Sequence, residues 1–161
     1  MNYNFKDTEL IVYDFDGVMT DNTAYVFEDG KEAVRVSRAD GLGVQIIKKM
    51  GFRQMILSTE ANEVVAVRAK KLGIECHHGI EDKANQIMRI CQENELSMEK
   101  IVYVGNDIND EKAMRLVGMP IAPADANKVI KKASRLVLES KGGQGVIREL
   151  AEILKTNHER T

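Results

Sequence analysis

Between its eleventh and twentieth residues the chain reads Ile11-Val12-Tyr13-Asp14-Phe15-Asp16-Gly17-Val18-Met19-Thr20. A short apolar run ends here in two carboxylates one residue apart, and a glycine follows them. In an extended chain, residues i and i+2 point to the same side, so Asp14 and Asp16 are expected to face one pocket. Two buried like charges are costly unless a cation or a substrate compensates them. The pattern favours metal binding or acid–base chemistry, although Asp-x-Asp-Gly also occurs in calcium loops and ordinary turns.

Length and composition indicate one soluble domain over residues 1–161. The chain is 43% hydrophobic and 30% charged, and its net charge of −2 comes without a long basic run, so nothing favours nucleic-acid binding. No apolar stretch is long enough to cross a bilayer. The two cysteines, Cys76 and Cys91, form no disulfide framework. We therefore expect a cytoplasmic protein with no nucleic-acid or membrane partner.

Strands and helices are expected to alternate along the chain. Strands are predicted at 10–13, 55–57, 74–77, 101–104, 119–122 and 136–138, and helices at 40–50, 61–72, 82–94, 109–117, 126–133 and 145–154. Asp40 is the expected cap of the first helix. An Asp29-Gly30 turn predicts a β-hairpin flap at about 22–38. This order predicts an α/β fold of three layers, Rossmann-like, with a parallel sheet between helices.

Polar residues follow the predicted core strands at the edge where parallel sheets place their active sites. They are Asp14 and Asp16 after the first strand, Ser58 and Thr59 after the second, Lys83 at the start of a helix, and Asn106 and Asp107 after the fourth. Clustered carboxylates suit Mg²⁺, and a hydroxyl with a lysine suits phosphate oxygens. A carboxylate can also attack phosphorus. The set predicts Mg²⁺-dependent phosphoryl transfer through an aspartate, whereas taken singly Ser58 could cap a helix and Lys83 could pair with an acid.

These residues also form four ordered motifs, over nearly the whole chain, that resemble those of the haloacid dehalogenase-like phosphatases. The motifs are Asp14-Phe15-Asp16-Gly17-Val18-Met19-Thr20, Ser58, Lys83 and Gly105-Asn106-Asp107-Ile108-Asn109-Asp110. The resemblance implies that Asp14 is the nucleophile and that Asp16 protonates the leaving oxygen and then activates water. It implies that Ser58 and Lys83 hold the phosphoryl group.

The same resemblance implies a Mg²⁺ site made by Asp14, the backbone carbonyl of Asp16, and Asp107. Asp110 is expected to orient Lys83 or a metal-bound water. One departure from the family pattern is Asn106, which stands where many members carry a second acid.

The segments 17–57 and 84–106, where this family places its cap domains, have no room for one. The chain therefore resembles the capless branch that contains octulosonate 8-phosphate and nonulosonate 9-phosphate phosphatases. Members of that branch are tetramers in which a neighbour's hairpin and C-terminal tail, here about 139–161, complete each site. Gly142 and Gly143 match the tail's glycine-rich segment, although a flexible loop explains them equally well. A tetramer would bury the apolar residues of the hairpin, Tyr25, Val26, Phe27, Val34 and Val36.

The second motif bears on the substrate. Thr59 and Glu60 resemble the nonulosonate group and the phosphatase domain fused to some acylneuraminate cytidylyltransferases, whereas octulosonate phosphatases typically have Thr-Gly-Arg there. Glu60 would meet hydroxyl or N-acyl groups, and Arg68 or Lys71 would meet the substrate carboxylate. Alternatively, Glu60 only favours a helix N-terminus, and the basic pair is a solvated face.

We therefore expect a Mg²⁺-dependent phosphatase for a small nonulosonate 9-phosphate, with octulosonate 8-phosphate as the alternative substrate. A non-catalytic oligomerisation module associated with a cytidylyltransferase is the alternative from another class. Loss of the nucleophile or of a metal-binding acid would favour that module, but Asp14, Asp16, Lys83 and Asp107 are all present.

Overall fold

Six parallel strands form the central sheet of the computed structural model, which describes residues 3–159. Residues 1, 2, 160 and 161, which the expected domain and C-terminal tail include, lie outside the described part. Across the sheet the strands are β5 (Glu75–His77), β4 (Gln54–Leu57), β1 (Leu10–Tyr13), β6 (Ile101–Val104), β7 (Met119–Ala122) and β8 (Leu136–Val137). Every neighbouring pair in this order is parallel. The expected parallel α/β sheet is confirmed.

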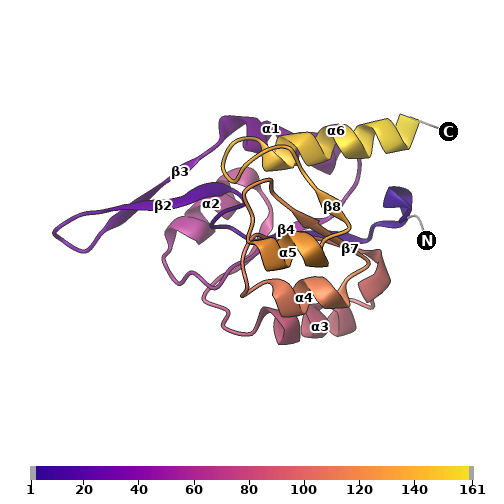
Figure 1. The fold of residues 1–161 in the computed structure, drawn as a ribbon, viewed down its shortest axis with the longest axis horizontal. Coiled ribbons are helices and arrows are strands. Elements are labelled where there is room, and N and C mark those ends of the chain that lie inside the picture. Colours follow the sequence, from indigo (N-terminus) through magenta and orange to yellow (C-terminus); the bar gives the residue numbers. More distant parts are fainter. Residues whose placement is uncertain (1–2, 160–161) are drawn as a thin grey trace.

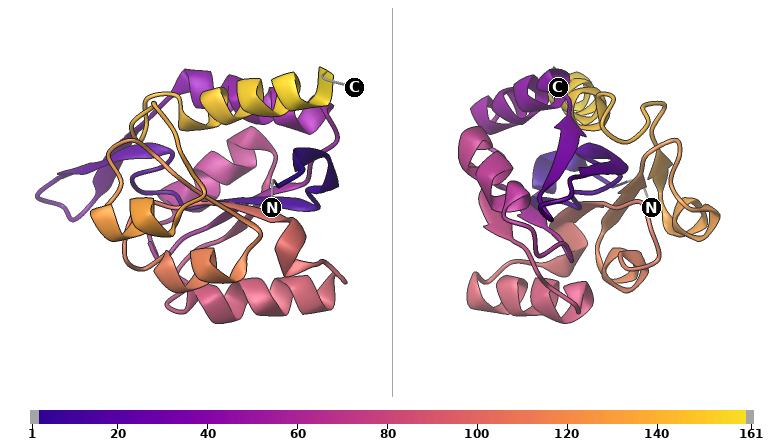
Figure 2. Two further views of the ribbon diagram at one scale, coloured as in Figure 1. Left: turned by 45° about the vertical axis from the view of Figure 1, so that its right-hand side comes forward. Right: turned by 90° about the vertical axis from the view of Figure 1, so that its left-hand side faces the viewer.

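Helices cover both faces of this sheet (Figures 1 and 2). One face carries α1 (Arg38–Lys49), α2 (Val64–Leu72) and α6 (Val146–Glu159), and the other carries α3 (Lys83–Glu93), α4 (Glu111–Leu116) and α5 (Lys128–Ala133). Two short 3₁₀ helices, η1 (Phe5–Asp7) and η2 (Met98–Lys100), complete the helical elements of the described residues. None of the helices within residues 3–159 is both long and apolar enough to cross a membrane.

The alternation of side chains along β1 explains the three layers. Ile11 and Tyr13 pack into the apolar cluster beneath α1, α2 and α6, whereas Leu10 and Val12 pack into the cluster beneath α3, α4 and α5. Successive residues of a strand point to opposite faces, and here both faces are covered. All four residues of β1 are therefore apolar and buried.

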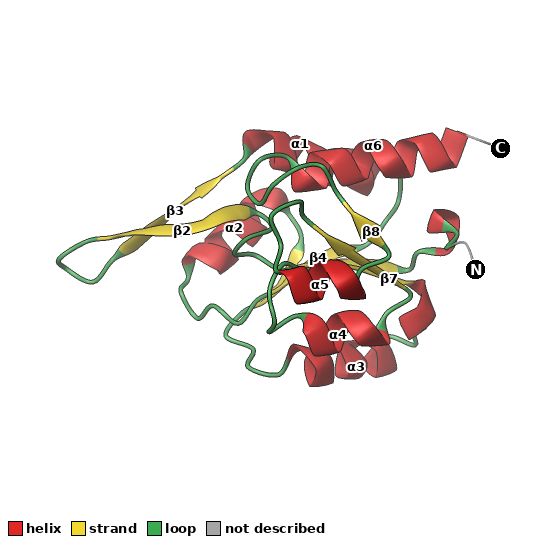
Figure 3. Cartoon of the chain, viewed as in Figure 1, coloured by secondary structure: helices red, strands yellow, loops and turns green. Residues whose placement is uncertain are grey.

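A separate antiparallel hairpin, β2 (Thr20–Val26) and β3 (Glu32–Val36), extends from the body of the molecule (Figure 3). Its register is irregular between Thr20 and Ala24, where a β-bulge interrupts the pairing. Within the described residues, the segment 17–57 contains only this hairpin, α1 and β4, and 84–106 contains α3, η2 and β6. The prediction of a hairpin flap without a cap domain is confirmed.

Several helix boundaries differ from the sequence prediction, and three of them have a clear physical reason or a large shift. The predicted cap at Asp40 was wrong, because Ser37 is the N-cap of α1 and its hydroxyl accepts the backbone N–H groups of Ala39 and Asp40. The helix predicted from 61 begins at Val64, because Glu60 and Asn62 hold the preceding residues in side-chain-bonded turns. The last helix, predicted to end at about 154, continues to Glu159.

Candidate active site

Asp14 lies directly beyond the carboxyl end of β1. Its backbone N–H donates to the carbonyl of Val104 at 2.9 Å, which fixes it beside β6. Its Oδ1 accepts hydrogen bonds from the N–H of Phe15 and from Nζ of Lys83, both at 2.7 Å. Burial and the nearby charge of Asp110 raise the pKa of Asp14, and the Lys83 ammonium opposes this rise. Asp14 is thus a buried carboxyl whose negative charge calls for a further cation.

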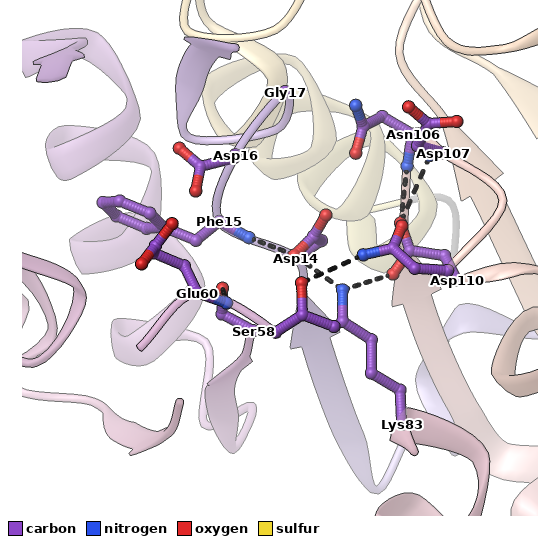
Figure 4. A network of polar contacts seen from close by, with 12 residues as sticks. Asp14, Phe15, Asp16, Gly17, Ser58, Glu60, Lys83, Asn106, Asp107 and Asp110 are labelled. Carbon is purple, nitrogen blue, oxygen red and sulfur yellow. Dashed lines mark hydrogen bonds and ion pairs between the residues drawn. The ribbon is translucent and has the colours of Figure 1, made fainter. Parts of the chain in front are cut away.

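Lys83, the first residue of α3, lies between two carboxylates (Figure 4). Its ammonium is 2.7 Å from Oδ1 of Asp14 and 2.7 Å from Oδ1 of Asp110, and its side chain is fully buried. Burial alone would lower the pKa of Lys83, but the two carboxylates raise it above its ordinary value. Lys83 therefore carries a positive charge in the floor of the site.

Asp110 connects Lys83 to the loop after β6. Its Oδ1 also accepts the hydroxyl of Tyr103 at 2.9 Å, while its Oδ2 accepts the backbone N–H groups of Asn106 and Asp107 at 3.0 and 3.3 Å. The side chain is fully buried. Asp110 thus contacts both the lysine and the loop that carries Asp107.

Asp16 is held through Thr20. The hydroxyl of Thr20 donates to Oδ1 of Asp16 at 3.0 Å and accepts the backbone N–H groups of Gly17 and Asn22. Burial raises the pKa of Asp16, the hydrogen bond from Thr20 lowers it, and the charge of Glu60 adds to the rise. A raised pKa suits a carboxyl that must hold a proton before it can donate one.

The oxygen atoms of the site fit a hard divalent cation. Asp14, Asp107 and Asn106 line the same cavity, and Oδ1 of Asn106 is buried without a hydrogen-bond partner. In residues 3–159, no three His, Cys, Asp or Glu side chains are grouped to hold a metal by themselves. A metal here would be bound by the carboxylates of Asp14 and Asp107, the main-chain carbonyl of Asp16 and water, which suits Mg²⁺.

Ser58, Thr59 and Glu60 follow β4 on the other side of Asp14. Oγ of Ser58 accepts the N–H of Glu60 at 3.1 Å, so the serine stabilises its own turn and also lines the cavity. Oε1 of Glu60 accepts the N–H of Asn62 at 2.7 Å. Oγ1 of Thr59 accepts Nδ2 of Asn109 at 3.2 Å, which joins the two loops across the site.

These loops and one face of the hairpin line an open cavity of about 420 Å³. A volume in this range suits a small molecule. The lining residues are Asp14, Asp16, Asn22, Thr23, Ala24, Glu32, Val34, Ser58, Thr59, Glu60, Asn62, Val64, Asn106, Asp107, Ile108 and Asn109. The structure therefore brings the predicted strand-end residues together, above the Lys83 ammonium.

Arg68 and Lys71 lie elsewhere in this chain. They line a second cavity, between α1 and α2, together with Arg38 and Gly41. Nη2 of Arg68 donates to the carbonyl of Ser37 at 3.0 Å, so the guanidinium is directed toward α1. Within one chain, the structure does not bring the predicted basic pair to the active-site cavity.

Gly142 and Gly143 pack behind the loop that carries Asp16 and do not line the cavity. The N–H of Gly143 donates to the carbonyl of Val18 at 3.0 Å. A Cβ atom on Gly142 would lie 2.7 Å from the carbonyl carbon of Gly17. The glycines permit this close approach of two backbones, so in one chain they support the active-site loop.

Sequence reasoning missed Thr20, Tyr103 and Glu32 as residues of the site. Thr20 ends the motif that contains Asp16, and a hydroxyl four residues after an acid was the available signal. Tyr103 occupies an apolar position in the predicted buried strand 101–104. Its hydroxyl group was the available signal that it could hydrogen-bond to Asp110. Glu32 belongs to the hairpin, and its approach to the cavity follows from the tertiary fold.

Comparison with known families decides the class of this protein. The sequence profile of the haloacid dehalogenase-like hydrolases matches residues 44–150, which is more than half of the chain. The chain belongs to the haloacid dehalogenase-like hydrolases. The matched range contains Ser58, Lys83 and Asp107, while Asp14 and Asp16 precede it.

Two relatives of this hydrolase carry different names. N-acylneuraminate cytidylyltransferase A of Danio rerio is 30% identical over 145 residues, which make up 89% of this chain and 34% of that protein. The chain thus spans about a third of that relative's length. The structure of 3-deoxy-D-manno-octulosonate 8-phosphate phosphatase from Moraxella catarrhalis, in complex with magnesium ion, phosphate ion and KDO, is 27% identical. The match covers 96% of this chain and 89% of the Moraxella catarrhalis chain, with a TM-score of 0.91.

A third relative, from Streptomyces avermitilis and assigned to the same hydrolase family, is 44% identical. The match covers 92% of this chain and 86% of that one, with a TM-score of 0.90. Family membership, the phosphatase relative and the arrangement of Asp14, Asp16 and Lys83 agree, so the protein is a phosphatase. The resemblance stated from the four motifs is confirmed.

Proposed function

We propose that this phosphatase is Mg²⁺-dependent and hydrolyses a nonulosonate 9-phosphate, a nine-carbon 2-keto-3-deoxy sugar acid, through an aspartyl-phosphate on Asp14. The observation that carries this proposal is one cavity that places Asp14, Asp16 and Asp107 near Glu60. The first three residues provide the chemistry of a phosphatase. Glu60 provides an acceptor for the hydroxyl or amide groups of the sugar.

In the first step, the carboxylate of Asp14 attacks phosphorus. Oδ1 of Asp14 accepts hydrogen bonds from Phe15 N–H and from Lys83, which fix the orientation of the attacking carboxylate. As the new bond forms, the ester bond between phosphorus and the sugar oxygen breaks. Asp16 gives its proton to that oxygen, and the sugar acid leaves as the free alcohol.

In the second step, Asp16, now a carboxylate, takes a proton from water, and the water oxygen attacks phosphorus. The bond between phosphorus and Asp14 breaks, phosphate leaves, and Asp16 has recovered its proton. Lys83 offsets negative charge at Asp14, and Ser58 donates its hydroxyl to a phosphoryl oxygen. Mg²⁺ bound by Asp14, Asp107 and the Asp16 carbonyl would neutralise charge on the phosphoryl oxygens.

The substrate carboxylate finds no basic partner among the residues that line the cavity. We therefore propose that Arg68 and Lys71 meet a substrate only across a subunit boundary, because in their own chain they line a different cavity. Thr59 and Glu60 remain proposed contacts within the chain, and Gly142 and Gly143 are proposed contacts for a neighbour's substrate.

We further propose a homotetramer assembled through the hairpin. Tyr25 and Val26 are 70% and 71% exposed, and Phe27 is also exposed, at the end of an element that projects from the body. Large exposed apolar side chains on such a projection favour a protein contact. The sequence predicts that Val34 and Val36 are buried between chains. Within one chain, both side chains are partly buried against that chain's own core. Light scattering tests this assembly, and a monomeric mass would contradict it.

Octulosonate 8-phosphate is the alternative substrate, because the phosphatase relative from Moraxella catarrhalis is named for it and was solved with KDO. The two substrates imply different places in metabolism, sialic-acid-type synthesis for nine carbons and lipopolysaccharide precursors for eight. We propose the cytoplasm for either reaction, in keeping with the two free cysteines. The role of a purely structural oligomerisation module is disfavoured by the complete catalytic set.

The test is phosphate release from the nine-carbon and the eight-carbon ester, with Mg²⁺ and with EDTA. We expect release that requires Mg²⁺ and a higher kcat/KM for the nine-carbon ester. A preference for the eight-carbon ester would move the enzyme to the alternative substrate and leave Glu60 without a specificity role. No release from either ester by a folded oligomer would contradict the proposed function.

A further inference from the structure

The wall of the active-site cavity is acidic beyond what the chemistry requires. Five carboxylates line it, and the lining residues within 3–159 include no Lys, Arg or His. Asp14, Asp16 and Asp107 have roles in phosphoryl transfer and metal binding. Glu32 and Glu60 have no role in these steps, and their charges oppose the approach of a phosphate ester. A hydrogen-bond donor on the substrate would make their presence favourable.

Glu32 belongs to the face of the hairpin that is turned toward the cavity. It is the first residue of β3, where it pairs with Val26, and Val34 pairs with Ala24. Alternate residues of a strand point to one side, so Glu32 and Val34 share a face. Ala24, Glu32 and Val34 all line the cavity. This face of the hairpin thus presents a carboxylate, beside the turn, next to apolar side chains.

The other side of the cavity carries a similar pair. Glu60 is half-buried and is oriented by the N–H of Asn62, which donates to its Oε1 at 2.7 Å. Val64, at the start of α2, lines the same cavity. An ionised carboxylate accepts hydrogen bonds and repels other anions. Val34 and Val64 offer apolar surface against which carbon atoms of a substrate can pack. The two walls together fit an uncharged group that donates hydrogen bonds and repel a carboxylate.

Resting on the proposed function, we propose that Glu32 is a specificity-determining residue for the phosphatase. Its carboxylate accepts a hydrogen bond from a hydroxyl or amide N–H of the sugar, at a position away from the substrate's own carboxylate. Ala24 and Val34 pack against the carbon that bears the donor group.

The test compares a long and a short ester in the Glu32→Ala and Glu32→Gln variants. The long ester is a nonulosonate 9-phosphate, and the short one is glycerol 3-phosphate, which has only three carbons. We expect Glu32→Ala to lower kcat/KM for the long ester by about tenfold to a hundredfold more than for the short one, as for a lost hydrogen bond to a charged acceptor. Glu32→Gln keeps an acceptor oxygen and should lose less.

Glu28→Ala is the matched control, because Glu28 lies in the turn of the same hairpin and does not line the cavity. It should leave both kcat/KM values unchanged. Equal losses on the two esters in Glu32→Ala would overturn the proposal, because they would mean that Glu32 only supports the hairpin. Parallel esters with an N-acetyl or a hydroxyl group at the same ring carbon identify which donor is recognised.

A binding measurement separates this inference from the proposed function. The free nine-carbon sugar acid is titrated calorimetrically into the wild type and into Glu32→Ala, with Mg²⁺ and inorganic phosphate present, so that no turnover is needed. Weaker binding by Glu32→Ala supports the role of Glu32 even if the wild type hydrolyses no ester. Equal affinities overturn that role even if the wild type is an active phosphatase.

Discussion

Asp40 and Ile147 are joined by a hydrogen bond of 2.7 Å between Oδ1 of the aspartate and the backbone N–H of the isoleucine. The same oxygen accepts the N–H of Arg148 at 3.2 Å. Asp40 lies in the first turn of α1, while the other two residues begin α6. One buried carboxylate thus caps a helix that begins over a hundred residues later. It also anchors the segment next to Gly142 and Gly143.

Replacing Asp40 by alanine should lower the free energy of unfolding by about 1–3 kcal/mol, because two backbone N–H groups at the start of α6 lose their acceptor. Urea unfolding measures this change. The companion variant Ser37→Ala should cost about 1 kcal/mol, because Ser37 is the N-cap of α1. No loss in Ser37→Ala would mean that the Ser37 hydroxyl does not stabilise the start of α1.

Asp40 should also make stability depend on pH. Burial raises the pKa of Asp40 in the folded protein, although the N–H groups of Arg148 and Ile147 and the charge of Arg68 oppose the rise. The folded state therefore binds the proton more tightly than the unfolded state, whose carboxyl has a pKa of about 3.9. This contribution to stability is present below that value and is lost as pH rises through the folded pKa.

Asp40→Asn removes the titration and keeps an oxygen for the cap. We expect the wild type to lose stability relative to Asp40→Asn as pH rises from the ordinary carboxyl range toward neutrality. Urea unfolding of both proteins at several pH values measures the difference. A constant difference, or one that grows in favour of the wild type, would show that the folded pKa of Asp40 is not raised.

The strand-end part of the site was predictable from the sequence, and the reason is local. Short apolar runs such as 10–13 and 101–104 predict buried parallel strands, and the polar residues after them must then meet at one edge. Asp14, Ser58 and Asp107, which that argument predicts to lie close together, line one cavity. The strand-end argument requires only the positions of the strands, and the apolar runs in the sequence predict those positions.

The remaining parts depend on contacts between distant segments. The partner of Asp40 is more than a hundred residues away, so its side chain was assigned to the nearest helix end instead. The helix that contains Arg68 begins later than predicted and packs so that its guanidinium meets the carbonyl of Ser37. Glu32 reaches the cavity only because the hairpin lies beside it. Periodicity does not specify such packing.

Lys83 should be essential for stability as well as for turnover. Lys83→Met leaves Asp14 and Asp110 buried without their ammonium partner, which should cost about 3–5 kcal/mol when EDTA removes any metal. The double variant Lys83→Met with Asp110→Asn should recover part of this loss, because only one buried carboxylate then remains.

Urea unfolding of the two single variants and the double variant gives the coupling energy. Lys31→Met serves as the control, because Lys31 pairs with Asp29 on the surface and should contribute less than about 1 kcal/mol. Strict additivity of the Lys83 and Asp110 variants would contradict a shared buried ion-pair network.

Gly142→Ala should reduce turnover by moving the active-site loop. An added Cβ would lie 2.7 Å from the carbonyl carbon of Gly17, next to Asp16, so one of the two backbones must shift. A displacement of about 1 Å in a catalytic group can cost about a hundredfold in rate, and we expect a loss of about tenfold to a hundredfold in kcat. Steady-state phosphate release measures it.

Gly51→Ala is the control for Gly142→Ala. Gly51 has a φ of 90° and open space around it, so an alanine there introduces backbone strain without a collision. It should lower stability by about 1 kcal/mol and leave kcat unchanged. Equal kcat values for Gly142→Ala and the wild type would show that the loop around Asp16 does not depend on this packing.

Asp14→Asn should abolish most of the turnover. The amide keeps the size of the side chain and an oxygen for the N–H of Phe15, but it is a poor nucleophile toward phosphorus. Lys83 keeps its ion pair with Asp110, so the fold should persist, which circular dichroism verifies. We expect kcat to fall by at least about a thousandfold, while Asp29→Asn on the exposed hairpin turn keeps wild-type activity. Substantial phosphate release by folded Asp14→Asn would mean that another group attacks phosphorus.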